Sequence, residues 1–510
     1  MLAKIYSSAV IGIDAYLVDV EVDISLGFPA FSVVGLPDAS VKESRERVVS
    51  AIKNSDYEFP VKKITINLAP ADIKKEGPCF DLPIAVGILQ AEEHIKTDKL
   101  KKYLLIGELS LDGTVRSVKG ILPIAIHAKE KKFDGLILPY ENRDEAAVVN
   151  GLNVYPVKNL CEAIGFLNDE FQIAPYILNL QEIFSIGMNY DVDFSEVKGQ
   201  EHAKRAIEIA AAGGHNILMV GPPGSGKTML ARRLPTILPE MTMDEAIETT
   251  KIHSISGLLS GKKGLISKRP FRSPHHTISD AGLIGGGTFP HPGEVSLAHH
   301  GVLFLDELPE FRKNVLEVLR QPIEDGEITI SRSLKALTFP SRFMLAAALN
   351  PCPCGFHTHP ERECICNPNQ IQKYLSKISG PLMDRIDIML EVPAVKYKDL
   401  TDDKQSETSS EIRTRVNKSR FIQQERFKNS KNIFCNSHMR SKDIKKHCEL
   451  TPETKKILEN AILSMKLSAR AYDRILKVAR TIADLSGTLN IETEHIAEAI
   501  QYRTLEQKFI

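Results

Sequence analysis

The sequence predicts an α/β protein built around a parallel sheet with helices on both faces, with an α+β domain before it and helices after it. Two apolar runs, residues 217–220 and 302–305, have the length of buried strands, and polar residues with phosphate or metal chemistry follow each of them. The last quarter of the chain has helical periodicity, which is clearest at residues 468–485. The order of strand, glycine-rich loop and helix at the first run is the strongest of these indications.

The glycine-rich loop after the first run predicts nucleotide binding. It follows the pattern Gly-x-x-x-x-Gly-Lys-Thr between a strand and a helix. Glycines let the backbone curl so that successive N–H groups point at a phosphate chain, and the helix N-terminus adds the positive end of its dipole. Lys227 is expected to reach the outer phosphates of ATP, and the Thr228 hydroxyl to bind Mg²⁺. The loop comprises Gly221, Pro222, Pro223, Gly224, Ser225, Gly226, Lys227 and Thr228.

Two carboxylates follow the second run. A buried strand that ends in Asp306 and Glu307 is costly unless these groups have a function. Asp306 is suited to hold the hydration shell of Mg²⁺, and Glu307 to orient and polarise the attacking water. A solvated acidic turn would explain one acid alone. Together with the glycine-rich loop, however, the pair supplies parts that phosphoryl transfer requires.

Two further polar residues are candidates for the same chemistry. The apolar stretch 342–350 ends at Asn350, whose neutral amide is suited to sensing the γ-phosphate or positioning the water. Arg385 lies between Asp384 and Asp387, which is consistent with an ordinary ion pair. The alternative is an arginine finger, which enters the site of a neighbouring subunit and neutralises charge in the transition state.

Whole-chain properties limit the function classes. A chain of 510 residues with 43% hydrophobic and 25% charged residues predicts a soluble protein of several domains, which we place at residues 1–170, 171–395 and 396–510. Because the formal net charge is zero, any nucleic-acid binding must come from local patches. Neither a signal peptide nor a membrane-spanning run is recognisable, so we expect a cytoplasmic protein without membrane contact.

Residues 1–170 are predicted to form the α+β domain. Residues 18–24 alternate apolar and acidic side chains, as a half-exposed strand does, and residues 39–54 have helical periodicity. Residues 80–90 predict a buried helix, and Asp112 with Gly113 predicts a tight turn after a strand. None of these patterns carries nucleotide chemistry.

Two segments of this domain, residues 75–81 and 107–115, resemble the proteolytic domain of Lon-type proteases, which use a Ser–Lys dyad. In that alignment Cys79 occupies the place of the nucleophile and Leu122 that of the lysine, with Lys119 nearby. A nucleophile needs a base to activate it. The resemblance therefore implies a Lon-like fold without protease activity, with Cys79 as a buried thiol.

A cluster of cysteines directly follows Asn350. Four soft ligands in one short stretch suit a tetrahedral Zn²⁺ ion, and His357 and His359 are alternative or outer ligands. Reduced thiols without metal are the alternative, although clustered thiols have no packing rationale. We predict a structural zinc knuckle that stiffens an insertion facing DNA. Its ligands are Cys352, Cys354, Cys364 and Cys366.

Two stretches suit contact with a nucleic-acid backbone. Residues 326–339 alternate apolar and polar side chains before a polar turn, which predicts a hairpin with Arg332 and Lys335 near its tip. Residues 411–446 form a long basic segment. Solvated basic surfaces have the same patterns, and that alternative stays open for both.

Together these motifs resemble the magnesium-chelatase-like AAA+ ATPases and, among them, the ComM/YifB family. Residues 270–287, 292–299 and 305–311 match long signatures of that family, and the resemblance covers essentially the entire chain. It implies a homo-oligomeric ring, a hexamer, with ATP sites between subunits. It also implies a sensor role for Asn350, a finger role for Arg385 and a helical lid at residues 396–510.

Within that lid, Arg470 resembles the second sensor arginine of AAA+ ATPases, which acts either in its own site or in the neighbour's. The implied activity is that of a helicase, which couples ATP hydrolysis to translocation and branch migration on single-stranded or branched DNA. Its context would be natural transformation, with recombination proteins as partners.

Three other functions agree less well with these motifs. The Lon-like front, the cysteines and the basic segment count against a magnesium-chelatase motor subunit. The missing dyad counts against an ATP-dependent protease. The complete set of hydrolysis residues counts against a DNA-binding scaffold without catalysis.

Overall fold

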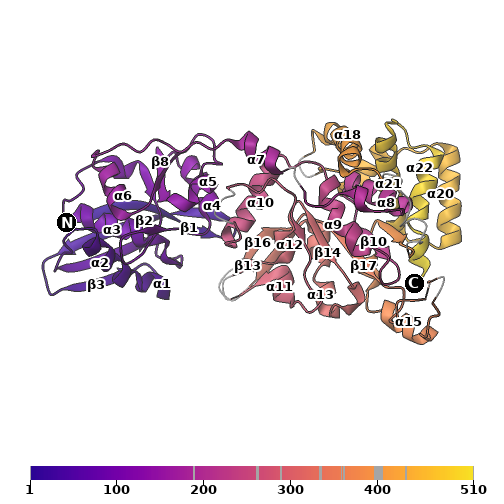
Figure 1. Cartoon of the computed structure of the whole chain (residues 1–510), viewed down its shortest axis with the longest axis horizontal. Helices are drawn as coiled ribbons and strands as arrows, with labels where there is room; N and C mark the ends of the chain where they lie inside the picture. The colour runs from indigo at the N-terminus through magenta and orange to yellow at the C-terminus, as the bar shows by residue number, and fades with distance from the viewer. Residues whose placement is uncertain are drawn as a thin grey trace. The chain divides into compact units, whose positions relative to one another are not determined.

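The computed structural model describes residues 2–187, 190–259, 264–287, 290–331, 336–357, 359, 362–394, 406–430 and 433–508. The chain forms two compact units (Figure 1). Unit 1 consists of Met1–Gly187 and Met243–Ser267, and unit 2 of Met188–Thr242 and Lys268–Ile510. The chain therefore passes between the units after residues 187, 242 and 267.

Unit 1 is built on a mixed sheet with the strand order β3-β4-β2-β1-β5-β8-β9. The alternation predicted at residues 18–24 follows the pleat of β2, because Val18, Val20 and Val22 are buried while the acidic residues between them face outward. Strands β1, β2 and β4 pair antiparallel, whereas β1, β5, β8 and β9 are parallel neighbours. The strands are β1 (Leu2–Ile11), β2 (Asp14–Ser25), β3 (Ala30–Val34), β4 (Lys63–Ala69), β5 (Tyr103–Leu105), β8 (Gly135–Pro139) and β9 (Asn153–Val157).

Helices pack against this sheet. Helix α3 (Asp81–Ala91), predicted from its apolar run, is buried along nearly all its length against β1, β2 and α2. The helix predicted at residues 39–54 is present as two, α1 (Ala39–Lys42) and α2 (Ser44–Asn54), separated at Glu43. The other helices are α4 (Ile121–Glu130), α5 (Arg143–Ala146), α6 (Leu160–Leu167) and α7 (Leu180–Gly187).

Helix α10 (Met243–Ile255) belongs to unit 1, although we assigned its residues to the ATPase domain at 171–395. It packs on α4, and the Ser254 hydroxyl donates a hydrogen bond to the buried Glu145 carboxylate. The Ser254 carbonyl accepts from the Gly120 amide at 3.3 Å. A side chain on Gly264 would collide with the backbone of Asp144, since a Cβ would lie 2.2 Å from its carbonyl oxygen. These contacts hold the segment in unit 1, and not in the domain predicted at residues 171–395.

Unit 2 contains a five-stranded sheet with the order β11-β14-β17-β10-β18, in which all neighbours are parallel. Its central strands are apolar and buried, as we predicted for the two apolar runs, which confirms the parallel α/β core. Helices α8 (Glu201–Gly213) and α9 (Lys227–Ile237) pack against this core. The strands are β11 (Phe271–Arg272), β14 (Val302–Leu305), β17 (Met344–Leu349), β10 (Ile217–Val220) and β18 (Ile388–Glu391).

Short elements extend the core. Strands β15 (Glu327–Ser331) and β16 (Ala336–Pro340) pair antiparallel, so the hairpin predicted at residues 326–339 is confirmed in its two arms. A smaller pair is β12 (Gly285–Gly286) with β13 (His291–Pro292). The helices are α11 (Asp280–Ile284), α12 (Glu294–Leu297), α13 (Lys313–Glu317), α14 (Arg320–Asp325), α15 (Pro368–Leu375) and α16 (Gly380–Met383).

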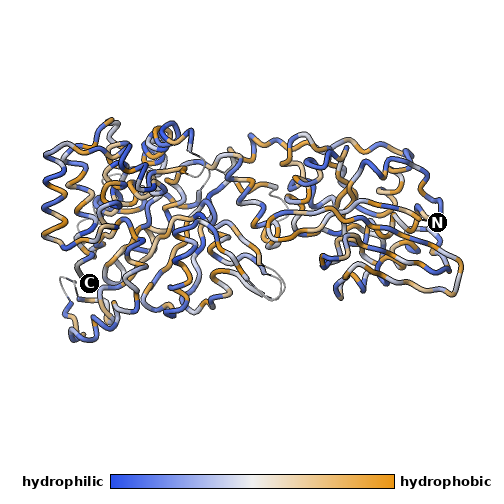
Figure 2. Tube along the Cα trace, turned by 180° about the vertical axis from the view of Figure 1, so that it is seen from behind, coloured by the Kyte–Doolittle hydropathy of each residue, from blue (hydrophilic) through white to orange (hydrophobic). Residues whose placement is uncertain are grey.

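The last part of unit 2 is helical, and hydrophobic and hydrophilic residues alternate along its peripheral helices (Figure 2). Helix α21 is amphipathic, as predicted for residues 468–485, and buries Ile475, Leu476 and Ile482. Its neighbours α8, α18 and α22 pack against it. The helices are α18 (Ser409–Phe427), α19 (Ser441–His447), α20 (Pro452–Met465), α21 (Ala469–Ser486) and α22 (Thr493–Gln501).

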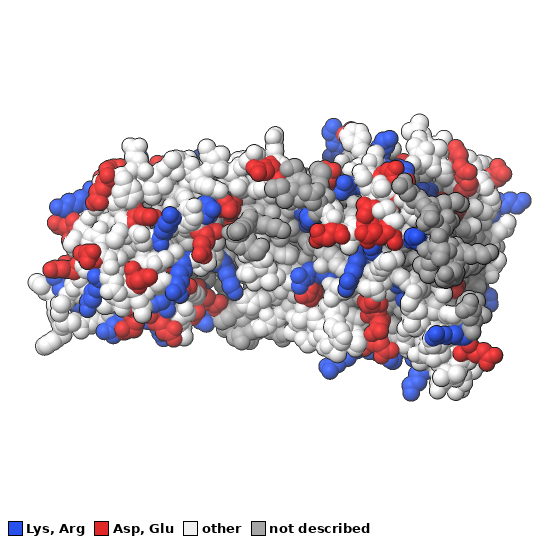
Figure 3. All heavy atoms as spheres, viewed as in Figure 1, with Lys and Arg blue, Asp and Glu red and all other residues white. Residues whose placement is uncertain are grey.

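The surface charge is mixed. On the face shown in Figure 3, positive and negative side chains are interspersed, in keeping with the formal net charge of zero. In the described part of the chain, no helix has both the length and the hydropathy that a membrane span requires.

Candidate nucleotide-binding site

The glycine-rich loop connects the carboxyl end of β10 to α9. Gly224 and Gly226 have φ angles of +76° and +88°, which glycine adopts without strain. Gly221 is restricted by space, because a Cβ there would lie 2.1 Å from the Val392 carbonyl oxygen. The Gln200 amide donates to the Ser225 carbonyl at 2.6 Å, which places the segment before α8 against the loop. The backbone therefore has the curled form that a phosphate cradle requires.

The Lys227 side chain lies over this loop. Its ammonium donates to the carbonyls of Gly221 at 2.7 Å and Pro222 at 2.9 Å, and to the Asn350 amide oxygen at 3.2 Å. Burial lowers the pKa of Lys227 to about 8, although Asp306 and Glu307 act in the opposite direction. A buried ammonium that is bonded to neutral carbonyls is strongly stabilised by an anionic partner, so the position suits phosphate oxygens.

Thr228 and Asp306 meet at the same edge of the sheet. The Thr228 hydroxyl donates to the Asp306 carboxylate at 2.6 Å. One begins α9 and the other follows β14, and the parallel strands β14, β17 and β10 end side by side. A hydroxyl beside a carboxylate, next to a phosphate cradle, is a donor set that fits a hydrated Mg²⁺ ion.

Glu307 has an unusual backbone. Its φ angle is +53°, a left-handed conformation that costs roughly 1–3 kcal/mol for a residue other than glycine. Its amide donates to the Asp306 carboxylate at 3.0 Å, and its own carboxylate lies 3.4 Å from Nδ1 of His276. Strain of this kind is concentrated at functional sites, where the surrounding structure holds it in place. We did not single out His276 from the sequence, although it lies inside the signature at residues 270–287.

The cysteine cluster lies directly beside the loop. The Sγ atoms of Cys352 and Cys354 are 3.3 Å apart, and Cys364 lies 3.7 Å and 3.6 Å from them. The ligand atoms of all four cysteines, Cys366 included, lie within 4.8 Å of one another. Tetrahedral zinc with Zn–S bonds of about 2.3 Å would separate its sulfurs by about 3.8 Å, so the donor set fits that ion. A Cβ on Gly355 would lie 2.5 Å from Pro223, so this segment packs tightly on the glycine-rich loop.

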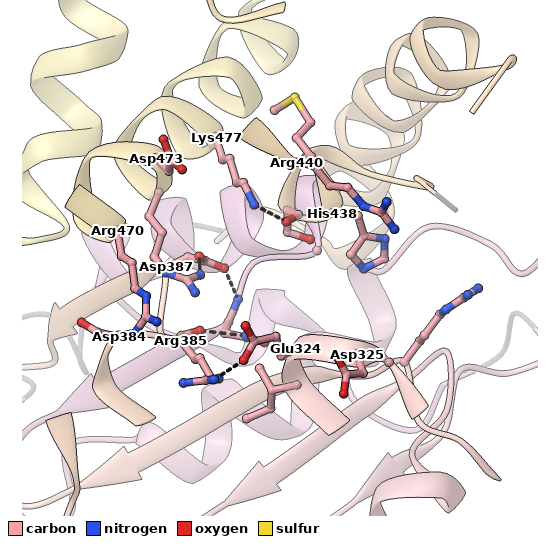
Figure 4. A pocket seen from close by; sticks show the side chains of 18 of the residues that line it. Glu324, Asp325, Asp384, Arg385, Asp387, His438, Arg440, Arg470, Asp473 and Lys477 are labelled. Atoms are coloured by element: carbon pink, nitrogen blue, oxygen red, sulfur yellow. Dashed lines mark hydrogen bonds and ion pairs between the residues drawn. The ribbon is translucent and has the colours of Figure 1, made fainter. Parts of the chain in front are cut away.

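Arg385 and Arg470 are found at the opposite edge of the same sheet. The Arg385 carbonyl accepts from the side-chain amide of Asn216 at 2.9 Å. Asn216 precedes β10, whereas the glycine-rich loop follows β10. Both arginines line a cavity of about 530 Å³ (Figure 4). Arg385 pairs with Glu324, and Arg470 pairs with Asp384 at 2.9 Å. At about 3.3 Å per residue, the length of β10 separates this cavity from the glycine-rich loop of the same chain.

The two DNA-binding candidates cannot be placed, because Arg332 and Lys335 lie outside the described residues. The basic segment at 411–446 is described in part, and several of its arginines make contacts inside unit 2. Arg415 pairs with Glu208 at 2.5 Å, Arg426 pairs with Asp484, and Arg420 donates to the carbonyls of α8. These contacts favour the alternative, in which the basic segment is an ordinary solvated surface of helices that pack within unit 2.

Comparison with known protein families places the chain. The family described as magnesium chelatase, subunit ChlI, matches residues 193–400. Two related families, subunit ChlI of Mg-chelatase and its C-terminal part, match residues 20–142 and 406–503. Competence protein ComM of Haemophilus influenzae is 46% identical over 510 residues, which cover 99% of this chain and 98% of the relative.

The chain belongs to the magnesium-chelatase-like ComM/YifB family. The uncharacterized protein YifB of Escherichia coli is 42% identical over 100% of this chain and 98% of its own length. Lon protease 2 of Bacillus subtilis is 31% identical over 26% of this chain and 23% of its own length. Membership of the ComM/YifB family confirms the resemblance drawn from the motifs and makes the protein a magnesium-chelatase-like AAA+ ATPase.

Proposed function

We propose that this ComM/YifB protein is a ring-forming ATPase that hydrolyses each ATP between two subunits. The observation that carries the proposal is the division of the predicted residues between two edges of one sheet. Lys227 lies at one edge, with Thr228 and Asp306, whereas Arg385 and Arg470 line the cavity at the other. A repeated contact between one edge and the opposite edge of the next copy is heterologous, and such contacts form a ring when the rotation between successive copies closes.

Each residue then has a defined role. Lys227 contacts the outer phosphates, Thr228 and Asp306 hold Mg²⁺, and Mg²⁺ supplies charge neutralisation for the phosphates. Glu307 orients and polarises the attacking water, and Asn350, bonded to Lys227, reports the γ-phosphate. Arg385 and Arg470 of the neighbouring subunit neutralise the charge that develops on the transferred phosphoryl group. For Arg470, the position in the cavity favours a role in the neighbour's site over one in its own.

Mixed rings test this arrangement. Lys227→Ala and Arg385→Ala subunits should each be inactive alone, because every site then lacks one half. Mixed in equal amounts, they should regain ATP hydrolysis, since about one quarter of the sites in a randomly mixed ring combine an intact loop with an intact finger. Absence of any regain, with both variants assembled, would contradict the shared site.

We also propose that hydrolysis drives movement on branched or single-stranded DNA in the cytoplasm. The support is the competence name of the Haemophilus influenzae relative and the hairpin of β15 and β16, whose predicted tip carries Arg332 and Lys335. ATP-dependent unwinding of a synthetic four-way junction is the measurement. An Arg332→Ala/Lys335→Ala double variant should lose unwinding while keeping basal ATP hydrolysis. A wild-type ATPase rate that does not respond to DNA would argue against this function.

Two other functions have partial support. The match to magnesium-chelatase families favours a motor that acts on a partner protein, and such a motor would hydrolyse ATP without any response to DNA. The partial identity to Lon protease 2 raises the question of proteolysis. Burial raises the pKa of the Cys79 thiol to about 12, which leaves it protonated and a poor nucleophile at neutral pH. We therefore propose that the N-terminal unit has no protease activity.

A further inference from the structure

The short loop that carries Arg385 is anchored by a buried carboxylate two residues further on. Asp387 is 2% exposed, and its carboxylate accepts from the backbone N–H of Asn216 at 3.0 Å and pairs with Arg474. The imidazole Nδ1 of His215 lies 3.6 Å away. Although burial opposes ionisation, Arg474 and His215 hold the pKa of Asp387 well below its usual range.

These partners come from two different elements. His215 and Asn216 immediately precede β10, whereas Arg474 projects from α21. Arg470 lies one turn earlier on α21 and pairs with Asp384 at 2.9 Å. Two ion pairs therefore attach the 384–387 loop to α21, one on each side of Arg385, and Figure 4 shows Asp384, Arg385, Asp387 and Arg470 around the same cavity.

The same loop is tied to the glycine-rich loop through the sheet. Strand β18 begins directly after Asp387 and lies parallel to β10. At its other end, the Val392 amide donates to the Val220 carbonyl at 2.7 Å, and the Val392 carbonyl is in close contact with Gly221. The 384–387 loop and the glycine-rich loop are thus at opposite ends of two paired strands, which are stiff because their backbone groups are hydrogen-bonded.

We propose that Asp387, together with Arg474, is a positioning residue that orients Arg385 toward the nucleotide of the neighbouring subunit. Asp387 contacts no nucleotide itself. It fixes the loop on the end of β10 and on α21, so that Arg385 and Arg470 are presented as one rigid pair. This inference rests on the shared site proposed above, and it gives a role to Asp387, which the sequence indicated only as an acid that flanks Arg385.

The test uses Asp387→Asn in the full-length protein. The amide keeps the size of the side chain but removes the charge that holds Arg474, and a partly buried guanidinium without its carboxylate is unfavourable. We expect the turnover number for ATP to fall at least tenfold while KM changes less than twofold, because the variant's own nucleotide loop is intact. Asp473→Asn is the matched control, since Asp473 lies on the same helix and lines the same cavity. It should keep wild-type turnover.

Mixed rings separate positioning from a loss of folding. Asp387→Asn subunits mixed with Lys227→Ala subunits should regain activity to the level of the Arg385→Ala mixture, because Lys227→Ala subunits supply intact fingers. Wild-type turnover by Asp387→Asn alone, or no regain in a mixture where Arg385→Ala does regain, would overturn this inference and leave the shared site standing.

If neither mixture regains activity, the shared site fails, and the inference about Asp387 fails with it. Arg474→Gln provides a second variant in case Asp387→Asn does not fold, and its expected behaviour is the same. Arg474→Lys, which keeps a positive charge near Asp387, should retain more turnover than Arg474→Gln.

Discussion

The Lys227 ammonium donates a hydrogen bond to the Asn350 amide oxygen at 3.2 Å. This contact joins the start of α9 to the end of β17, two segments that are far apart in the sequence and adjacent at the sheet edge. Because Asn350 contacts the residue proposed to bind phosphate, it is placed to respond to the presence of a γ-phosphate.

Loss of Lys227 and loss of Asn350 should affect different steps of the ATPase cycle. Lys227→Ala should abolish detectable nucleotide binding and hydrolysis. Asn350→Ala should keep nucleotide binding within a fewfold but lower turnover roughly 100-fold, a loss of about 2.7 kcal/mol of transition-state stabilisation, as for other single donors in catalytic sites. Steady-state ATPase assays and binding of a fluorescent ADP analogue distinguish the two. Equal loss of binding in both variants would show that Asn350 has only a structural role.

The contact between His276 and Glu307 predicts a second pair of outcomes. Glu307→Gln should bind ATP and retain it without hydrolysis, since the amide cannot polarise water. His276→Ala should lower turnover several-fold with little change in nucleotide affinity, because His276 helps to hold the Glu307 carboxylate, 3.4 Å away. His275→Ala is the matched control and should have the smaller effect, since His275 bonds to Thr277 and reaches Glu307 only through the His276 ring, whose centroid lies 4.1 Å from its own. A larger effect of the control than of His276→Ala would contradict this role.

The lowered pKa of Lys227 predicts a pH dependence of ATP binding. Below about pH 8 the free protein carries the ammonium, whereas above it the amine is neutral and must take up a proton when phosphate binds. ATP affinity should therefore fall by up to about tenfold per pH unit above pH 8. Calorimetry in two buffers of different ionisation enthalpy measures the proton uptake. Uptake that is zero at pH 8.5 would contradict the pKa.

The lowered pKa of Lys227 also makes stability depend on pH, but stability rises with pH where ATP affinity falls. Without nucleotide, the unfolded chain holds the Lys227 proton up to about pH 10.5, whereas the folded chain releases it near pH 8. Between these values the unfolded state binds more protons, so this group makes the free energy of unfolding rise with pH. Comparison with Lys227→Met, which lacks the titrating group, isolates the contribution.

Metal binding at the cysteine cluster should influence the nucleotide loop. We expect one equivalent of zinc per chain in the purified protein and its loss in Cys364→Ser. Because Gly355 packs against Pro223, zinc removal should weaken nucleotide binding, and by reciprocity bound nucleotide should slow zinc release to a chelator. Cys161→Ser is the control, since Cys161 is an exposed thiol in unit 1. Zinc-free protein with unchanged nucleotide affinity would contradict the coupling.

The attachment of α10 predicts a stability effect in unit 1. Ser254→Ala removes one of the donors to the buried Glu145 carboxylate, which keeps those of Leu122 and Asn142. It should cost about 1.5–3 kcal/mol of unfolding free energy, as for other hydrogen bonds to charged groups. Ser256→Ala, two residues further on, is the matched control, because the Ser256 hydroxyl donates to the Ile252 carbonyl within the same segment. Denaturant unfolding followed by circular dichroism provides the measurement, and equal effects of both variants would contradict the role of Glu145.

Much of the candidate nucleotide site could be predicted because its parts are local in sequence. Eight consecutive residues form the loop, and Asp306 and Glu307 directly follow one apolar strand, so strand periodicity and motif spacing were sufficient. His276 was missed because its role depends on proximity to Glu307, and its own segment has no periodic pattern. The assignment of α10 to the ATPase domain was wrong because sequence order does not reveal which surface buries a helix.

By itself, the sequence determined the parallel α/β core, the glycine-rich loop, the cysteine cluster and the family, since each rests on contiguous residues. The tertiary structure decided where Arg385 and Arg470 lie. They belong to segments that follow the loop by more than a hundred residues, and only the parallel direction of β10 and β18 shows that the loop and the arginines occupy opposite edges. A strand has two ends, and periodicity alone does not say which neighbours meet at each of them.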